Sequence, residues 1–205
     1  GGLRARLFGS EVPRNDRWLT DFRAHCVEII SRLEADRPEA PFVESLYDSA
    51  AAQVWRLRPV DGDPGRRHDM TTCRSRYPAL ATARMARVRI GTLRFSRFGE
   101  CFCGVKIRRT PSAPFEGVAD LAALAAAAEE RLMRAGLGGL TGTGEGTDHV
   151  YLDLALMEIE PAVRLLRAVL ADSEIAAPAW LMFDEAGLED RYLPLTAGAP
   201  PTLHA

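Results

Sequence analysis

The sequence has a single lysine, few aromatic residues and no long apolar segment. Lys106 is that lysine, so almost all of the positive charge is carried by arginine. No stretch approaches the roughly 20 apolar residues that span a bilayer, and residues 1–12 hold no apolar run of signal-peptide length. We therefore expect a cytoplasmic protein with no membrane partner. The abundance of arginine and alanine is typical of a GC-rich bacterial genome.

Cysteine is also scarce, and its spacing does not fit a usual metal site. The four cysteines are Cys26, Cys73, Cys101 and Cys103. A Cys-x-Cys pair on a strand places both sulfurs on one face, but the second closely spaced pair of a zinc finger is missing. Zinc bound with His68 and His149, or a cysteine nucleophile, is the alternative, and no motif supports either. Because free cysteine is an ordinary core residue, we expect structural thiols, no metal and no cofactor.

Glycine is concentrated in residues 136–146, where its context argues against a phosphate-binding loop. Such a loop follows a strand and opens a helix, so that backbone N–H groups converge on the anion. These glycines instead follow a predicted helix and precede a predicted strand, and Glu145 and Asp148 would repel phosphate. We therefore expect a helix cap followed by a flexible connection.

The clearest structural signal is a β-α-β pattern in the C-terminal half. Apolar residues alternate with other residues from 150 to 157, which is the period of a half-buried strand. Residues 158–170 follow helical spacing, and residues 179–183 form a second apolar run. This pattern predicts that Leu152 and Leu166 pack the helix against the sheet.

The N-terminal part is predicted to be mainly helical. An apolar stripe from Trp18 to Leu33 predicts a first helix, and a stripe from Val43 to Trp55 predicts a second that forms a hairpin with it. Residues 59–72 contain Asp-Gly-Asp-Pro-Gly and lack periodicity, which predicts an exposed loop with a mobile tip.

The order of elements from Cys101 to Phe183 is predicted as strand, helix, short strand, strand, helix, strand. This order resembles the ferredoxin-like βαββαβ fold, in which an antiparallel four-stranded sheet carries two helices on one face. We therefore expect an α+β protein with a helical region and basic loop at 1–96, a ferredoxin-like unit at 97–186 and a tail at 187–205. Because the fold hosts many unrelated activities, it fixes no function.

Charge is unevenly distributed, although the net charge is only −2. Residues 56–109 carry 14 basic and 4 acidic side chains, whereas the chain after residue 111 is acidic. Such a basic zone suits an acidic protein partner or nucleic acid, or it faces the acidic half of the same chain. We predict an exposed basic patch that binds a partner. Its residues are Arg58, Arg66, Arg67, Arg74 and Arg76.

Two other groups of residues are candidate functional sites. Glu145, Asp148 and His149 lie close together at a predicted strand start, where an enzyme would place an acid and a base. Acidic residues in loops are more often simply solvated.

The face of the predicted sheet without helices is the second group. It would carry aromatic and charged side chains in the manner of RNA-recognition domains. These side chains are Phe102, Lys106, Arg108, Tyr151 and Asp153. We expect instead that the N-terminal helices cover this face and bury its aromatic residues.

The sequence therefore favours a protein that works by binding rather than by catalysis. An ample core, charged surfaces and no catalytic motif are typical of small bacterial protein-binding modules, including toxin-neutralising immunity proteins. An acidic protein is the first choice of partner. Nucleic acid bound by residues 56–109 is the alternative, and an enzyme with a site near Glu145, Asp148 and His149 is the third possibility.

Overall fold

The computed structural model describes residues 16–35, 37–59, 67–109, 118–189 and 191–199. The chain divides into two compact units, Gly1–Asp36 and Arg37–Ala205. None of the helices in these described ranges is both long and apolar enough to cross a membrane.

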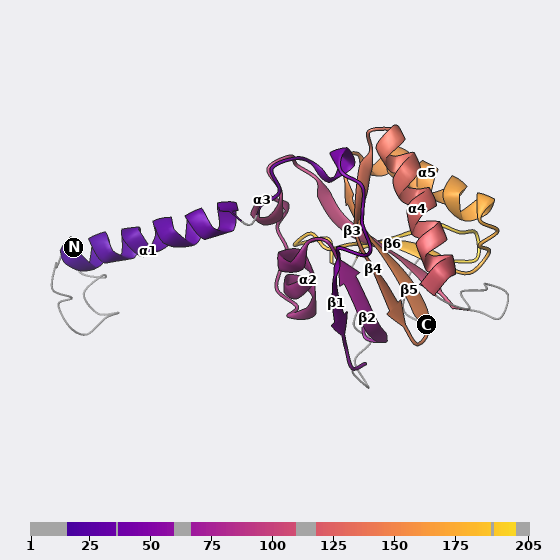
Figure 1. Cartoon of the computed structure of the whole chain (residues 1–205), viewed down its shortest axis with the longest axis horizontal. Coiled ribbons are helices and arrows are strands. Elements are labelled where there is room, and N and C mark those ends of the chain that lie inside the picture. Colours follow the sequence, from indigo (N-terminus) through magenta and orange to yellow (C-terminus); the bar gives the residue numbers. More distant parts are fainter. Residues whose placement is uncertain (1–15, 36, 60–66, 110–117, 190, 200–205) are drawn as a thin grey trace, which may run out of the picture. The chain divides into compact units, whose positions relative to one another are not determined.

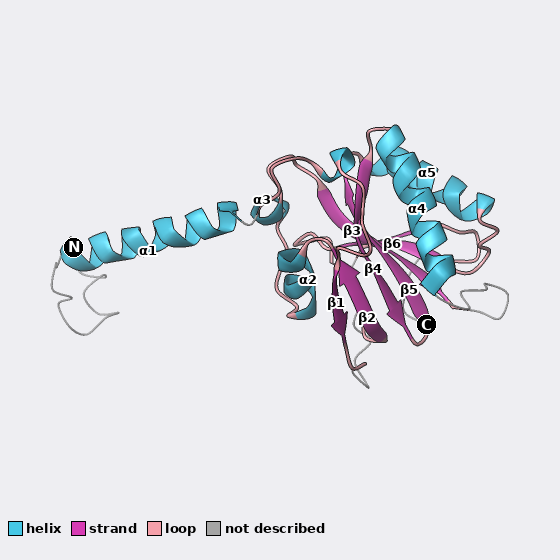
Figure 2. Cartoon of the chain, viewed as in Figure 1, coloured by secondary structure: helices cyan, strands magenta, loops and turns pink. Residues whose placement is uncertain are grey.

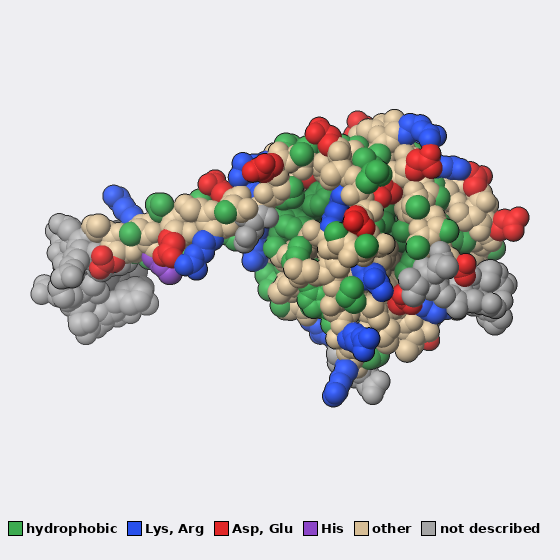
Figure 3. All heavy atoms as spheres, viewed as in Figure 1, with side chains coloured by type: hydrophobic (Ala, Val, Ile, Leu, Met, Phe, Trp, Pro, Cys, Tyr) green, Lys and Arg blue, Asp and Glu red, His purple; other side chains and the backbone are tan. Residues whose placement is uncertain are grey.

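The described part of the first unit is the helix α1 (Asp16–Ala35). This confirms the first helix predicted from the sequence. Its apolar side chains Phe22, Val27 and Ile30 are more than half exposed, and hydrophobic atoms are visible on its surface in Figure 3. Arg32 pairs with Glu28 one turn earlier at 2.5 Å, which is an exposed contact of small energetic weight.

The second unit is built on one sheet of seven strands in which every neighbouring pair is antiparallel (Figure 2). The strand order is β1-β2-β4-β5-β3-β6-β7. The strands are β1 (Gln53–Arg56), β2 (Met70–Ser75), β3 (Cys101–Arg108), β4 (Gly138–Gly146), β5 (His149–Leu156), β6 (Ala179–Phe183) and β7 (Tyr192–Pro194).

Helices lie on both faces of this sheet (Figure 1). The long helices α4 (Val118–Arg134) and α5 (Ile159–Asp172) pack together on one face. The short helices α2 (Pro78–Met85) and α3 (Thr92–Phe95) lie on the other, and a 3-10 turn at Phe42–Glu44 precedes β1.

The main core fills the space between the sheet and helices α4 and α5. Leu152 of β5 and Leu166 of α5 belong to it and are 1% and 2% exposed. The opposite face has an aromatic core of its own. Its rings are Phe42, Tyr77, Phe95 and Phe102, with centroids 5.5 to 6.4 Å apart. Phe102 and Tyr151 are fully buried, so neither ring is open for stacking on bases. The prediction that N-terminal helices cover this face is not confirmed in that form, because Phe102 packs with Phe42, Leu80 and Phe95 and Tyr151 packs with Met70 and Ala81.

The mixed α+β class is confirmed, and two finer predictions are wrong. The sheet has seven strands rather than the four of the predicted ferredoxin-like unit, because β1 and β2 extend it beyond β4 and β7 extends it beyond β6. The helix predicted from Val43 to Trp55 is absent, since residues 53–56 form β1.

Hydrogen bonds of another kind explain why the helix predicted from Val43 to Trp55 does not form. The Tyr47 N–H donates to Glu129 of α4 at 2.7 Å, and the Ala50 N–H donates to the Asp48 side chain. β1 then pairs with β2 over four residues. These contacts satisfy backbone groups that a helix would have bonded internally. The tip of the predicted loop, including Arg66, lies outside the described residues.

Replacing Leu152 or Leu166 by Ala should lower the free energy of unfolding by about 2 to 5 kcal/mol, because each truncation leaves a cavity in the main core. Urea denaturation measures the loss. Leu93→Ala is the control, since that side chain is 75% exposed and its loss should change stability by less than about 0.5 kcal/mol. Equal stability of all three variants would show that the main core is wrongly assigned.

Candidate functional site

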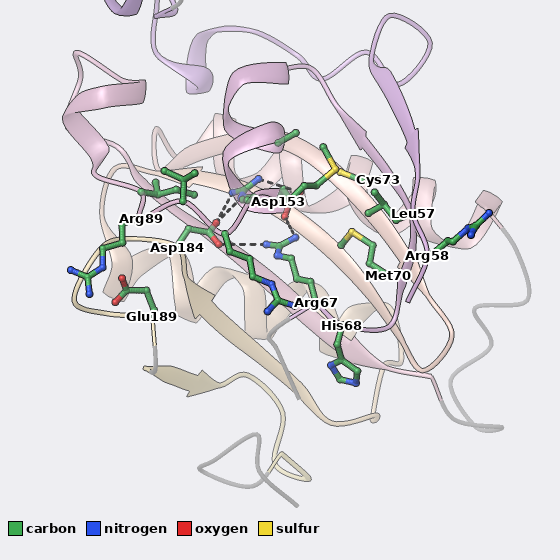
Figure 4. Close-up of a pocket in the computed structure, with 16 residues that line it drawn as sticks. Leu57, Arg58, Arg67, His68, Met70, Cys73, Arg89, Asp153, Asp184 and Glu189 are labelled. Atoms are coloured by element: carbon green, nitrogen blue, oxygen red, sulfur yellow. Dashed lines mark hydrogen bonds and ion pairs between the residues drawn. The ribbon is translucent and has the colours of Figure 1, made fainter. Parts of the chain in front are cut away.

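A cavity of about 430 Å³ opens on the face of the sheet that carries α2. Its lining comes from β2, α2 and β5, and from the segments that follow β1, α2 and β6 and precede β2 (Figure 4). Its apolar lining consists of Leu57, Met70, Ala81, Met85, Val88 and Ile90. Its charged or reactive lining consists of Arg58, Arg67, His68, Cys73, Arg84, Arg87, Arg89, Asp153, Asp184 and Glu189.

Four charged side chains form the floor of the cavity, and we call them the charged floor: Arg67, Arg84, Asp153 and Asp184. Arg67 Nη1 donates to Asp153 Oδ1 at 2.6 Å. Arg84 Nε and Nη2 both donate to Asp184 Oδ2, at 2.8 and 2.6 Å. Arg84 Nη1 lies 3.2 Å from Asp153 Oδ2, so one arginine spans both carboxylates.

The charged floor is buried and balanced. The Asp153 side chain is 1% exposed, Arg84 is 6% and Asp184 is 8%. Charges removed from water in this way must be paired to be tolerated. Burial would raise the pKa of Asp153, but the positive charges of Arg67 and Arg84 outweigh that effect and lower the pKa below its usual value. The carboxylate is therefore ionised, and the floor as a whole is neutral.

A glycine allows Arg67 to lie across the sheet. Gly104 of β3 pairs with Asp153 on one side and Met182 on the other. A Cβ at this position would lie 2.4 Å from Arg67 Nη2, far inside contact distance. Gly104 therefore provides the space in which the guanidinium rests above the strand.

Arg67→Gln should lower the free energy of unfolding by about 3 to 5 kcal/mol, because Asp153 would lose its best-placed partner while remaining buried. Chemical denaturation near neutral pH measures this. Arg58→Gln is the matched control, since Arg58 is exposed at the cavity mouth and should change stability by less than about 0.5 kcal/mol. A loss no greater than that of the control would show that Arg67 does not stabilise the floor.

Three more arginines surround the mouth of the cavity: Arg58, Arg87 and Arg89, all of them exposed. Figure 4 shows Arg58 on one side of the charged floor and Arg89 with Glu189 on the other. Together with the floor, the cavity is lined by five arginines and three carboxylates. Because the floor is balanced, the excess positive charge belongs to the mouth.

Arg87 adopts a backbone conformation that favours glycine. Its φ is 54°, in the left-handed region, directly after the end of α2. The Arg87 and Val88 N–H groups bond to the carbonyls of Arg84 and Ala83, which is the usual way a helix ends at such a residue. A side chain at this position costs about 1 kcal/mol or more. Glycine would be less strained at this position, and Glu174 after α5 has the same left-handed conformation with a φ of 56°.

The thiols at and near the cavity are poor nucleophiles. Burial raises the pKa of Cys73 to about 11, and the charge of Asp153 adds to the rise. Burial likewise raises the pKa of Cys101 to about 11. Both therefore remain protonated near neutral pH, whereas nucleophilic cysteines have lowered pKa values. Across the described residues, no group of three or more His, Cys, Asp or Glu side chains could hold a metal ion.

Asp69 ties the segment that carries Arg67 to the sheet. Its Oδ2 accepts the backbone N–H groups of Asp148 and His149, each at 2.9 Å, and lies 3.2 Å from His149 Nδ1. Its Oδ1 accepts the Tyr151 hydroxyl. The Tyr151 ring centre lies 5.5 Å from the Arg67 guanidinium carbon. Asp69 therefore fixes the turn that delivers Arg67 to the charged floor.

Asp69→Asn should weaken stability near neutral pH by about 1 to 3 kcal/mol, because buried donors lose a charged acceptor. Burial would raise the pKa of Asp69, but hydrogen bonds from His149, Tyr151 and Asp148 hold it well below its usual value. The carboxylate thus contributes stability above its ordinary pKa of about 3.9, and this contribution is lost as pH falls below that value.

Chemical denaturation across a pH series tests this. The variant should lose less stability than the parent between about pH 5 and pH 3. Asp148→Asn, an exposed neighbour that keeps its backbone N–H, is the control and should follow the parent. An Asp69 variant with the same acid profile as the parent would contradict the assignment.

The arginines predicted from the sequence do not form one exposed patch. Arg58 is exposed at the cavity mouth, Arg66 lies outside the described residues, and Arg67 lies in the charged floor. Arg74 lines a separate cavity of about 200 Å³ beside α4. The Arg76 side chain is 14% exposed and donates to the carbonyls of Ser45 and Phe42. On the face drawn in Figure 3, basic side chains are scattered among hydrophobic ones. Partner binding by these arginines stays a prediction.

The predicted group of Glu145, Asp148 and His149 is divided by the structure. His149 contacts Asp69 rather than Glu145, and Glu145 lies 3.6 Å from Arg109. Asp148 is exposed and contributes its backbone to Asp69.

Sequence reasoning missed Arg84, Arg87 and Asp184 as site residues. One signal was available: Asp153 is a charged residue within an apolar strand, and such a residue requires buried partners. Comparison with known proteins found no matching family model, no similar curated protein and no similar solved structure.

Proposed function

We propose that this protein is a non-catalytic binding module whose second unit binds an acidic protein partner at the mouth of the cavity. The observation that carries the proposal is the arrangement of charge: a balanced floor beneath three exposed arginines, Arg58, Arg87 and Arg89. A surface of this kind attracts carboxylates and speeds their association.

The side chains around the cavity favour binding over chemistry. A general acid or base needs a pKa near the working pH, but the pKa of Asp153 is lowered and that of Cys73 is raised to about 11. Both thus hold a single protonation state near neutral pH.

Arg87→Gly should weaken binding of a short polyglutamate peptide severalfold while leaving stability unchanged or higher by about 1 kcal/mol, since glycine relieves the left-handed strain. Fluorescence anisotropy measures binding, and thermal unfolding measures stability. The weakening should be largest at low salt, because exposed charges are screened as ionic strength rises.

The chain offers a matched control in Glu174, whose φ is 56° at the end of α5. Glu174→Gly should change stability as Arg87→Gly does without weakening peptide binding. Polyglutamate binding that is absent from the parent, or equal in the two variants, would refute the proposal. Tighter binding of single-stranded oligouridine than of polyglutamate would favour nucleic acid as the partner.

A further inference from the structure

Beneath its basic mouth the cavity has an apolar wall, which an ion-binding surface alone does not require. Met70, Met85, Ile90, Leu57 and Val88 all line it. Met70 and Ile90 are buried, whereas Val88 is 43% exposed. Methionine side chains are flexible and adapt to differently shaped apolar groups. The lining therefore suits an apolar group that enters past the arginines.

The volume is large enough for such a group. A cavity of about 150 Å³ holds a benzene molecule, whereas this one measures about 430 Å³. Pockets of about 300 to 1,000 Å³ typically enclose most of a small ligand. A single large side chain fits inside with space for part of the adjoining backbone.

The charged floor sets the polarity of what can enter. Arg67 and Arg84 already pair with Asp153 and Asp184, so a third carboxylate at the floor would lie beside two existing ones. An acidic group is instead favoured at the mouth, among Arg58, Arg87 and Arg89. The ligand is thus apolar where it contacts the wall formed by Met70, Met85 and Ile90 and acidic where it meets the surface.

We propose that the cavity binds an acidic segment of a partner protein by taking in one large apolar anchor side chain, while flanking carboxylates contact the mouth arginines. This inference rests on the proposed function and specifies its ligand. Interfaces commonly concentrate their binding energy in such a buried anchor surrounded by polar contacts.

The probes are short synthetic peptides with a central Phe or a central Ala, flanked on both sides by Glu. The whole chain should bind the Phe peptide about tenfold more tightly or better, since burial of one aromatic ring contributes at least the 1.4 kcal/mol that a tenfold change represents. A Phe peptide flanked by Lys should not bind. Fluorescence anisotropy gives the dissociation constants.

The apolar wall is tested with Met85→Ala combined with Val88→Ala. The advantage of the Phe peptide over the Ala peptide should fall severalfold, while binding of the Ala peptide stays the same. Met157→Ala combined with Leu93→Ala is the matched control, since both side chains are exposed and neither lines the cavity. Thermal unfolding of each variant separates lost binding from lost folding.

The outcomes distinguish the two proposals. Equal binding of the Phe and Ala peptides would overturn the anchor inference and leave the acidic partner standing. Binding of neither Glu-flanked peptide would overturn both. If 3-phenylpropanoate alone bound as tightly as the Phe peptide, the occupant would be a small anionic molecule, and the protein segment would be rejected.

Discussion

The pairing of Asp153 is the constraint on which the second unit depends. A carboxylate in the middle of a buried strand must be matched by positive charge, and the match comes from two distant segments. Arg84 requires that α2 lie over the face of the sheet opposite α4 and α5. Arg67 requires the turn before β2 to cross Gly104. These two requirements place a helix and a turn over the same face, and the cavity is the space between them.

A second buried carboxylate makes the arrangement cooperative. Asp69 holds the turn through His149 and Tyr151, and Tyr151 contacts Arg67. The pKa values of Asp69 and Asp153 are both lowered, so both carboxylates are ionised near neutral pH. Loss of either charge would therefore weaken the contacts through Tyr151 and Arg67 that connect the two carboxylates. The shape of the cavity and the stability of the fold are therefore expected to fail together on acidification.

The spacing of apolar residues in the sequence predicted the strand β5 and the helix α5. Leu152 and Leu166 both lie in the main core, although β5 is buried along its whole length rather than on one face. The segment from Val43 to Trp55 was misassigned because its hydrogen bonds go to Glu129 and to β2, which no local pattern records. The charged floor could not be predicted for the same reason: Arg67 and Asp153 are 86 positions apart. Only the charge of Asp153 within an apolar strand pointed toward it.

Six arginines of residues 56–109 divide into two classes with different physical roles. Arg67, Arg76 and Arg84 are largely buried and bonded to acceptors within the unit, so the fold depends on them. Arg58, Arg87 and Arg89 are exposed, and exposed charges contribute little to stability. Arg87 also carries a conformational cost. Stability therefore accounts for the first class, and the proposed partner binding concerns the second.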